Sequence, residues 1–280
     1  MIKKKNKRVV ILGSGGFISS SVEVLLKKNK ISYLGLSRKK IDFTKKHSSK
    51  KLIRILKNSD TVLIIAAKAP CKDIEMLEDN LQIMKNILIA LTKKSVFKVV
   101  YLSSDAVYSD SMKKLNENSE TNPDNFHGLM HLMREQMLKL TNQNNLCILR
   151  PTLVYGENDP HNGYGPNSFL RLAKKNISIR IFGNGEELRD HVFIDDVANI
   201  ILSSIVNNFK GILNIVTGTK ISFHEIAKLA IKRTKSNSKI IKIRRKGLMP
   251  HNGYRLFNSS KLNSLVNFKP LNIKYNKFYK

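Results

Sequence analysis

Short apolar runs alternate with amphipathic segments over the first half of the chain, and this alternation constrains the fold more than any other feature. The apolar runs have the length of strands buried on both faces, and the segments between them carry apolar residues three and four positions apart, as helices do. The pattern predicts an α/β protein with parallel strands and right-handed helical crossovers. We expect strands at 8–12, 32–36, 61–66, 98–102 and 146–149, with helices at 17–28, 45–57, 74–92 and 127–141.

The pattern changes after Pro151, where residues 156–167 are rich in Gly, Pro and Asn and predict a long loop near a functional site. Beyond this loop we expect helices at 168–175, from 194 and at 223–233, strands at 178–182 and 211–216, a turn at 183–185 and an irregular basic tail. These shorter elements indicate a second, smaller lobe. The expected division is 1–165 and 166–280, with segments around 190–217 returning to the first sheet.

A glycine-rich turn, Gly13-Ser14-Gly15-Gly16, directly follows the first expected strand and precedes the first expected helix. Glycines permit a tight turn and let the backbone approach a pyrophosphate at the start of a helix, where the helix dipole is positive. The spacing is not G-x-G-x-x-G, because Ile18 stands at the last glycine; instead Gly13, Gly16 and Ser19 fit G-x-x-G-x-x-small. The turn predicts dinucleotide binding.

The second expected strand ends in Leu36-Ser37-Arg38, without the acidic residue that binds a ribose 2′-hydroxyl in many NAD sites. Arg38 could instead hold a 2′-phosphate, which favours NADP over NAD; the alternative is that Arg38 is one surface cation of a basic protein. Asp42, a few residues on, could meet the adenine amino group.

The net charge of +29 is unevenly spread, with +12 in residues 1–50, +1 in 51–209 and +16 in 210–280. Such basic ends could attract an anionic partner, whereas the alternative is a solvated surface, since most of the cations are lysines. There is no recognised nucleic-acid motif, so phosphorylated small molecules are the expected anions. No apolar run approaches the ~20 residues of a membrane span. Two cysteines, Cys71 and Cys147, fit a reducing cytoplasm.

Three further motifs stand in order along the chain: Val100-Tyr-Leu-Ser-Ser-Asp-Ala-Val-Tyr108, Leu149-Arg-Pro-Thr-Leu-Val-Tyr-Gly156, and residues 183–198 with Arg189-Asp-His-Val. Together with the glycine turn they resemble the extended short-chain dehydrogenase/reductase superfamily, specifically the NAD(P)-dependent nucleotide-sugar epimerase/dehydratase family, over residues 8–268. The resemblance implies a Rossmann-type doubly wound parallel sheet for the cofactor and a C-terminal lobe for a nucleotide-sugar. It also implies a cytoplasmic enzyme of carbohydrate biosynthesis and allows a homodimer built from a pair of helices per subunit.

The resemblance assigns roles to individual residues. Ser104 corresponds to the catalytic Ser/Thr that hydrogen-bonds the sugar oxygen, and Arg189 to the clamp on the substrate phosphates. The pair Asp195-Asp196 opens a helix, and we interpret it as capping and dipole compensation rather than catalysis. Further expected cofactor contacts are Gly13, Gly16, Phe17, Ile18, Ser37, Arg38, Asp42, Ala66, Ala67 and His131, and further expected substrate contacts are Asp105 and Asn167.

The sequence departs from this family at the acid/base pair Tyr-x-x-x-Lys. Pro123, Gly128 and Glu135 fix the register, so His127 takes the place of the tyrosine and His131 that of the lysine. A helix keeps both imidazoles on one face, and neutral His127 could take a proton from a sugar hydroxyl near neutral pH.

Other interpretations of the histidine pair stay open. The chain could bind cofactor and sugar without catalysis, or Tyr108, Tyr155 or Tyr164 could replace the missing phenol. A zinc site is disfavoured because no H-E-x-x-H carboxylate is present. We therefore expect an NAD(P)-dependent enzyme with Ser104, His127 and His131 at its centre, with epimerisation, dehydration and reduction all open.

Overall fold

The computed structural model describes residues 8–141, 144–207, 209–267 and 269–276. The chain divides into two compact units. Unit 1 holds residues 1–109, 120–151 and 198–213, and unit 2 holds 110–119, 152–197 and 214–280. Along the chain, unit 1 is interrupted by residues 110–119, ends after Pro151 and resumes over 198–213. No described helix is long and apolar enough to cross a membrane.

A six-stranded sheet in the order β10-β5-β4-β3-β1-β2 forms the centre of unit 1. The pairs β1–β2, β1–β3, β3–β4 and β4–β5 are all parallel, which confirms the predicted fold class. All carboxyl ends of β1–β5 therefore meet at one edge of the sheet, where ligands of such folds bind. The strands are β1 (Val9–Leu12), β2 (Tyr33–Leu36), β3 (Thr61–Ile64), β4 (Lys98–Leu102), β5 (Leu146–Pro151) and β10 (Gly211–Ile215).

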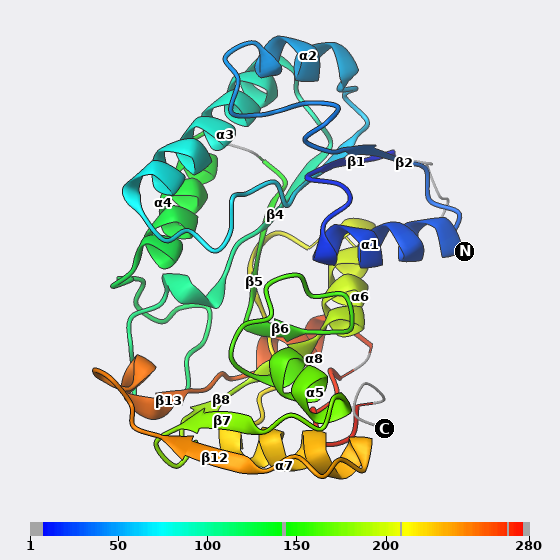
Figure 1. The fold of residues 1–280 in the computed structure, drawn as a ribbon. Coiled ribbons are helices and arrows are strands. Elements are labelled where there is room, and N and C mark those ends of the chain that lie inside the picture. Colours follow the sequence, from blue (N-terminus) through cyan, green and yellow to red (C-terminus); the bar gives the residue numbers. More distant parts are fainter. Residues whose placement is uncertain (1–7, 142–143, 208, 268, 277–280) are drawn as a thin grey trace. The chain divides into compact units, whose positions relative to one another are not determined.

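Helices cover both faces of this sheet, with α1 on one side and α3 and α4 on the other (Figure 1). Alternate strand residues, among them Val10, Val62 and Tyr101, enter a buried cluster with α3, because successive side chains of a strand point to opposite faces. Because helices cover both faces of the sheet, the side chains on both sides of a strand are apolar, which explains the continuous apolar runs of the sequence. The helices are α1 (Phe17–Lys28), α2 (Ser48–Ile55), α3 (Ile74–Lys93), α4 (Phe126–Leu140) and α6 (Ile194–Val206), and a 3-10 turn η1 (Asp105–Val107) follows β4.

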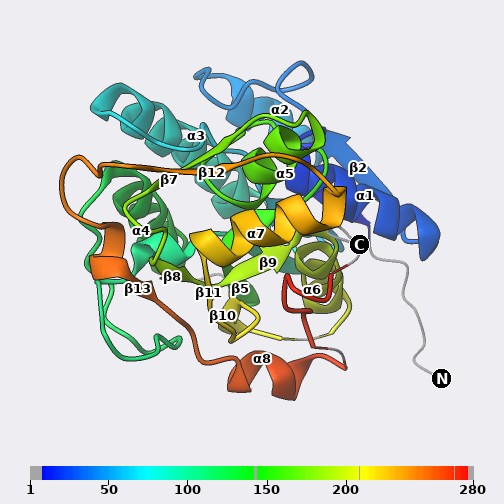
Figure 2. The ribbon, with the colours of Figure 1, turned by 60° about the horizontal axis from the view of Figure 1, so that its bottom comes forward.

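Unit 2 consists of small sheets and helices. A three-stranded sheet runs β11-β8-β13, and two strand pairs, β12–β7 and β6–β9, accompany it. Helices α5 and α7 pack against each other, and both can be followed in Figure 2. The elements are β6 (Leu153–Tyr155), α5 (Pro166–Lys174), β7 (Ile179–Phe182), β8 (Leu188–Arg189), β9 (His191–Phe193), β11 (Ile221–Ser222), α7 (Phe223–Thr234), β12 (Ile240–Ile243), η2 (Pro250–Gly253), β13 (Tyr254–Arg255) and α8 (Ser260–Leu265).

The expected irregular tail is wrong, because β12, β13 and α8 lie within it. These elements escape the sequence pattern because they are very short and because β12 is lysine-bearing and half-exposed. Helix α5 begins at Pro166, earlier than expected, since proline is well suited to the first helical position and Gly165 adopts φ +136° before it. The third strand ends at Ile64, so Ala66 lies in the following loop and not in the strand.

Candidate active site

The glycine turn after β1 has the geometry that the sequence predicts. Gly13 adopts φ +96°, and a Cβ atom there would lie 2.6 Å from the Ala66 backbone nitrogen. The position therefore requires glycine on two counts, conformation and close approach. Helix α1 follows at once, with the Gly16 N–H donating to Ser19 Oγ at 2.8 Å and no acidic residue in its first turn. The start of α1 is thus left free to attract an anion.

A cavity of about 250 Å³ opens over this turn in unit 1. Six of the expected cofactor residues line it, and Phe17, Ile18, Ser37 and His131 lie outside the lining. The lining includes Gly13, Ser14, Gly15, Gly16, Leu36, Arg38, Ile41, Asp42, Phe43, Thr44, Ala66, Ala67, Lys68 and Ile83. Its walls come from the loops after β1, β2 and β3, so the cavity lies at the carboxyl edge of the sheet.

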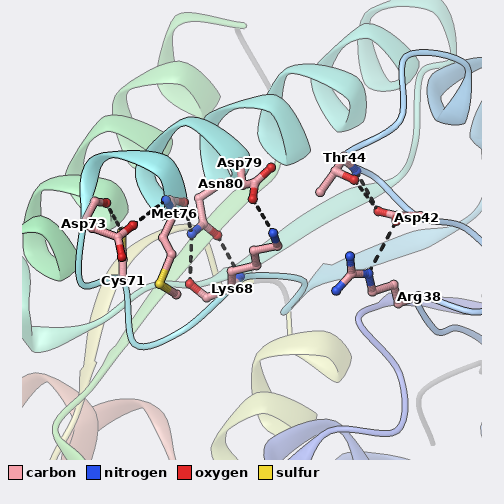
Figure 3. Close-up of polar contacts among 9 residues, drawn as sticks. All are labelled: Arg38, Asp42, Thr44, Lys68, Cys71, Asp73, Met76, Asp79 and Asn80. Atoms are coloured by element: carbon pink, nitrogen blue, oxygen red, sulfur yellow. Dashed lines mark hydrogen bonds and ion pairs between the residues drawn. The ribbon is translucent and has the colours of Figure 1, made fainter.

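Arg38 and Asp42, which both line the cavity, face each other (Figure 3). Arg38 Nε lies 3.4 Å from Asp42 Oδ2, and the arginine side chain is 71% exposed. Asp42 accepts hydrogen bonds from the Thr44 hydroxyl at 2.7 Å and the Thr44 N–H at 3.0 Å. These bonds, with a smaller contribution from Arg38, lower the pKa of Asp42. Asp42 is therefore held as an anion by Thr44, whereas the Arg38 guanidinium stays accessible to a ligand.

The opposite wall carries a lysine that the sequence analysis did not single out. Asn80, buried on α3, accepts from the Lys68 N–H at 2.9 Å and donates to the Lys68 carbonyl at 2.9 Å. The Lys68 ammonium forms an ion pair with Asp79, as Figure 3 shows. One turn of α3 thus fixes both the backbone and the side chain of Lys68 in the cavity wall. An asparagine among the apolar positions of an amphipathic helix is the sequence signal that could have pointed to this contact.

Ser104 follows β4 at the same edge of the sheet and caps η1. Its Oγ accepts from the Ala106 N–H at 3.2 Å and approaches Asp105 Oδ1 at 3.5 Å. Asp105 is buried within η1, and Ser104 is half-buried. The hydroxyl thus keeps its orientation through η1.

Helix α4 approaches η1 as closely as backbone atoms allow, and Gly128 makes this possible. A Cβ atom at Gly128 would lie 2.1 Å from the Ala106 carbonyl oxygen and 2.5 Å from the Pro123 side chain. The helix begins at Phe126, where the Asn125 side chain accepts from the Gly128 N–H at 2.9 Å. His127 therefore lies on a segment that touches the turn carrying Ser104.

The two histidines are adjacent on α4, as their spacing predicts. Their ring centroids are 4.8 Å apart and the rings are nearly perpendicular. His127 Nδ1 lies 3.4 Å from the Cys71 N–H, and His131 Nδ1 lies 2.8 Å from the Tyr101 hydroxyl. Burial, with His127 and Arg134 adding to it, lowers the pKa of His131 well below its usual range. His131 is therefore neutral and buried, whereas His127 is half-buried.

Behind the histidines a buried ion pair joins α4 to the sheet. Glu135 accepts two hydrogen bonds from Arg150, at 2.9 and 2.6 Å, and one from Ser103 at 2.6 Å. Both charged side chains are almost fully buried, so the pair needs these good contacts to offset desolvation. The carboxylate locks α4 to the ends of β4 and β5 and so sets the height of the histidines above the sheet.

The tyrosines considered as substitute phenols have structural contacts. Tyr108 is buried under the Arg150 guanidinium, 4.7 Å from its ring centroid, and Tyr155 stacks near Phe193. Tyr164 belongs to an aromatic cluster of unit 2, and its hydroxyl accepts from the Phe182 N–H at 3.2 Å. The phenol beside the histidines is instead Tyr101, whose pKa burial raises above its usual range.

Unit 2 holds the two residues expected to contact substrate from the C-terminal lobe. Arg189 is buried and pairs with Glu187 at 3.0 Å, while its Nε has no hydrogen-bond partner. Arg245 lies 3.8 Å from the same carboxylate. Asn167 braces the long loop, accepting from the Gly156 N–H at 3.0 Å and donating to Asp159 at 2.6 Å.

Helix α6 begins at Ile194, so Asp195 and Asp196 lie in its first turn, where carboxylates complement the helix dipole.

Among the described residues, no three His, Cys, Asp or Glu side chains gather as a metal ion would require.

In this parallel sheet the first strand leads through a glycine turn into a helix, and a cavity lies over the turn. This arrangement defines a dinucleotide-binding protein of the Rossmann type. The sequence model of the NAD dependent epimerase/dehydratase family matches residues 9–215, and the chain belongs to this family.

Individual relatives agree with this membership. A Methanocaldococcus jannaschii protein whose name assigns it to the UDP-glucose 4-epimerases is 38% identical over 149 residues, which is half of this chain and 48% of that protein. An ADP-L-glycero-D-manno-heptose-6-epimerase of Fusobacterium nucleatum is 25% identical over 92% of this chain and 90% of its own length. The crystal structure of Thermus thermophilus UDP-glucose 4-epimerase in complex with NAD has the same fold, with a TM-score of 0.80, 21% identity and 92% of each chain covered.

Proposed function

We propose that this protein is an NAD(P)-dependent enzyme that acts on a nucleotide-activated sugar by hydride transfer at a sugar carbon. One observation carries the proposal: the Ser104 turn and the His127 helix meet at Gly128, and the same helix reaches the wall of the glycine-lined cavity through a hydrogen bond from Arg134 to the Ala66 carbonyl. A hydroxyl, an imidazole and a cavity over the glycine turn thus lie within one unit. Family membership supports the same reaction class.

The glycine turn and Arg38 in the lining of the cavity suit the phosphates of the nicotinamide dinucleotide that the family implies. The close approach of Gly13 to Ala66 leaves no room for a side chain, so the backbone can contact a pyrophosphate at the start of α1. When bound, NAD(P) supplies a hydride acceptor and donor. Arg38 is exposed and contacts Asp42 only through a long 3.4 Å pair at Nε, while Asp42 also accepts from Thr44, so the guanidinium could turn to a 2′-phosphate. This supports NADP as the preferred cofactor, with NAD as the alternative.

Ser104 and His127 are the groups that would handle the sugar oxygen. The Ser104 hydroxyl is fixed by η1 and would hydrogen-bond this oxygen, and the His127 ring would hold the proton. Because a backbone N–H can only donate, the contact with Cys71 favours neutral His127 with its proton on Nε2. Taking a proton at Nε2 requires the other tautomer and loss of the Cys71 contact. At 3.4 Å this hydrogen bond is long and weak, so the switch costs little.

The substrate diphosphate would be bound by unit 2. The unpartnered Arg189 Nε is a buried donor that lacks an acceptor, and a phosphate oxygen would supply one. Arg245 adds a second guanidinium near Glu187. Asn167 and Asp105 are proposed as sugar contacts on the strength of the family pattern.

A homodimer through α3 and α4 is proposed on the basis of apolar exposure. Phe126, Leu129 and Met133 on α4 are each more than a third exposed and recur three and four residues apart, and Ile89 on α3 is similarly exposed. The two helices pack against each other, and we propose that their exposed apolar side chains form one surface. Light scattering at micromolar concentration should give twice the chain mass, and Met133→Lys should give the monomer mass.

A nucleotide-sugar screen tests the proposed function. Purified protein is incubated with each nucleotide-sugar and NAD or NADP, and products are followed by proton NMR of the anomeric signals. At least one sugar should convert in a cofactor-dependent way. His127→Ala should abolish the conversion, whereas His47→Ala, which removes an exposed histidine at the start of α2, should leave it unchanged. Cofactor binding without conversion of any sugar would instead support a binding protein without catalysis.

A further inference from the structure

Arg134 is a fully buried cation on the histidine face of α4, three residues after His131. Its Nη2 donates to the Ala66 carbonyl at 2.7 Å, and its Nη1 lies 3.7 Å from the Met130 sulfur. Its guanidinium carbon is 5.2 Å from the centroid of the Tyr101 ring. The Nε atom is buried without a hydrogen-bond partner. No carboxylate is among these contacts.

The lack of a carboxylate distinguishes Arg134 from the other buried arginines of the described chain. Arg150, Arg189 and Arg255 each form an ion pair with an acidic side chain. Glu135, next to Arg134 in the sequence, is engaged by Arg150 and Ser103. Burying a charge without a counter-ion costs free energy, so Arg134 lowers the stability of the folded protein. Such a group is expected where a site uses the charge.

The side chain on which this charge acts is His131. The titratable groups facing His131 are Tyr101 from β4, and His127 and Arg134 from α4 itself. A fixed cation beside an imidazole opposes its protonation, so Arg134 favours the neutral ring. A neutral ring accepts from the Tyr101 hydroxyl at Nδ1 when its own proton is on Nε2. In this tautomer His131 is a hydrogen-bond donor at Nε2, while Arg134 supplies the positive charge that a neutral imidazole lacks.

We propose that Arg134 is a positioning residue of this site, which supplies a fixed positive charge beside His131 and holds the Ala66 carbonyl at the wall of the cofactor cavity. The inference rests on the proposed function for its role in catalysis. Its physical core is that His131 is neutral with its proton on Nε2, and this statement applies to the protein without cofactor. Arg134 acts through His131 and Ala66 and need not touch the substrate.

Nitrogen NMR of the histidine rings in the cofactor-free, full-length protein tests this core. In the wild type, the His131 signals, assigned with His131→Gln, should show a proton on Nε2 and none on Nδ1 and should not move between pH 5 and 8. In Arg134→Met, which keeps the length but removes the charge, the His131 pKa should rise, so that its signals begin to move at the acidic end of this range. Arg134→Lys, which keeps the charge, should restore the wild-type behaviour.

The outcomes separate this inference from the proposed function. A folded Arg134→Met variant in which His131 titrates as in the wild type would overturn the inference, whatever the enzyme does. If Arg134→Met does not fold, Arg134→Gln replaces it, and a proton on Nδ1 in the wild type would equally overturn the inference. If turnover is measurable, Arg134→Met should raise the KM for cofactor and move the acidic limb of kcat upward in pH, and Arg134→Lys should recover both. Absence of turnover in the wild type would refute the proposed function and leave the NMR result standing.

Discussion

Substituting Gly128 by alanine tests whether the contact between α4 and η1 sets the catalytic geometry. The added methyl group would lie 2.1 Å from the Ala106 carbonyl oxygen, more than 1 Å inside a normal carbon–oxygen contact of about 3.3 Å. Because the Ala106 oxygen is backbone, and Pro123 blocks a second direction at 2.5 Å, α4 must shift by about 1 Å. His127 is the preceding residue and moves with it.

The magnitudes for stability and for activity differ, and the difference makes the test selective. Overpacking costs about 1–3 kcal/mol. Alanine returns about 1 kcal/mol because it is the better helix former, so the net loss of stability is about 0–2 kcal/mol. A misplacement of about 1 Å at a reacting group costs on the order of 100-fold in rate. We therefore expect Gly128→Ala to fold and to bind cofactor while losing about 100-fold in kcat.

Steady-state kinetics and urea unfolding on the same samples measure both quantities. Leu140→Ala is the matched control, since it removes an 81% exposed side chain at the other end of α4. The control should keep wild-type kinetics. Turnover of Gly128→Ala within threefold of the wild type, in a folded protein, would refute the reasoning that this contact positions His127.

Three further predictions follow from single side chains. Glu135→Gln leaves the Arg150 charge buried and unpaired, so the free energy of unfolding in urea should fall by about 3–5 kcal/mol; a loss below 1 kcal/mol would contradict the ion pair. Burial, with Arg189 adding to it, lowers the pKa of His191 to about 3, whereas the unfolded chain titrates near 6.5. The unfolded state therefore binds the extra proton between these values, and His191 should contribute about 1.4 kcal/mol of lost stability per pH unit below pH 6.5; in urea melts at pH 5 and 7, His191→Phe should reduce the slope by that amount and leave the part due to the buried, neutral His131. Arg38→Ala should raise the KM for NADP at least tenfold and leave that for NAD unchanged, with equal effects on both cofactors counting against a 2′-phosphate contact.

The sequence pattern predicts unit 1 well because its elements are long and buried. Helix α1 was expected at 17–28 and spans Phe17–Lys28, and β4 matches its expected range as well. The pattern fails in unit 2, where β8, β11 and β13 are two residues long and derive their pairing from distant segments. No local periodicity can indicate a strand of that length.

The candidate site shows the same limit. A backbone position that only glycine can occupy is visible in the sequence as a glycine. The turn at Gly13 could therefore be predicted from residue type and position. Lys68 and Arg134 could not, because their roles depend on contacts between segments far apart in the chain: Lys68 with Asn80 and Asp79, and Arg134 with Ala66. A single cation in a basic sequence gives no indication that it is buried. Tyr101 was hidden in the same way, as one apolar position of a buried strand.

Hydride transfer with His127 as the proton-holding group is the central claim, and a single-turnover experiment tests it most directly. Cofactor-loaded enzyme is mixed in a stopped-flow instrument with the nucleotide-sugar found in the screen, and the absorbance of reduced nicotinamide is followed. We predict an absorbance change in the wild type and in His47→Ala, a rise where the cofactor accepts the hydride and a fall where it donates it, and none in His127→Ala. Product formation without any such change, or the same change in His127→Ala, would contradict the account.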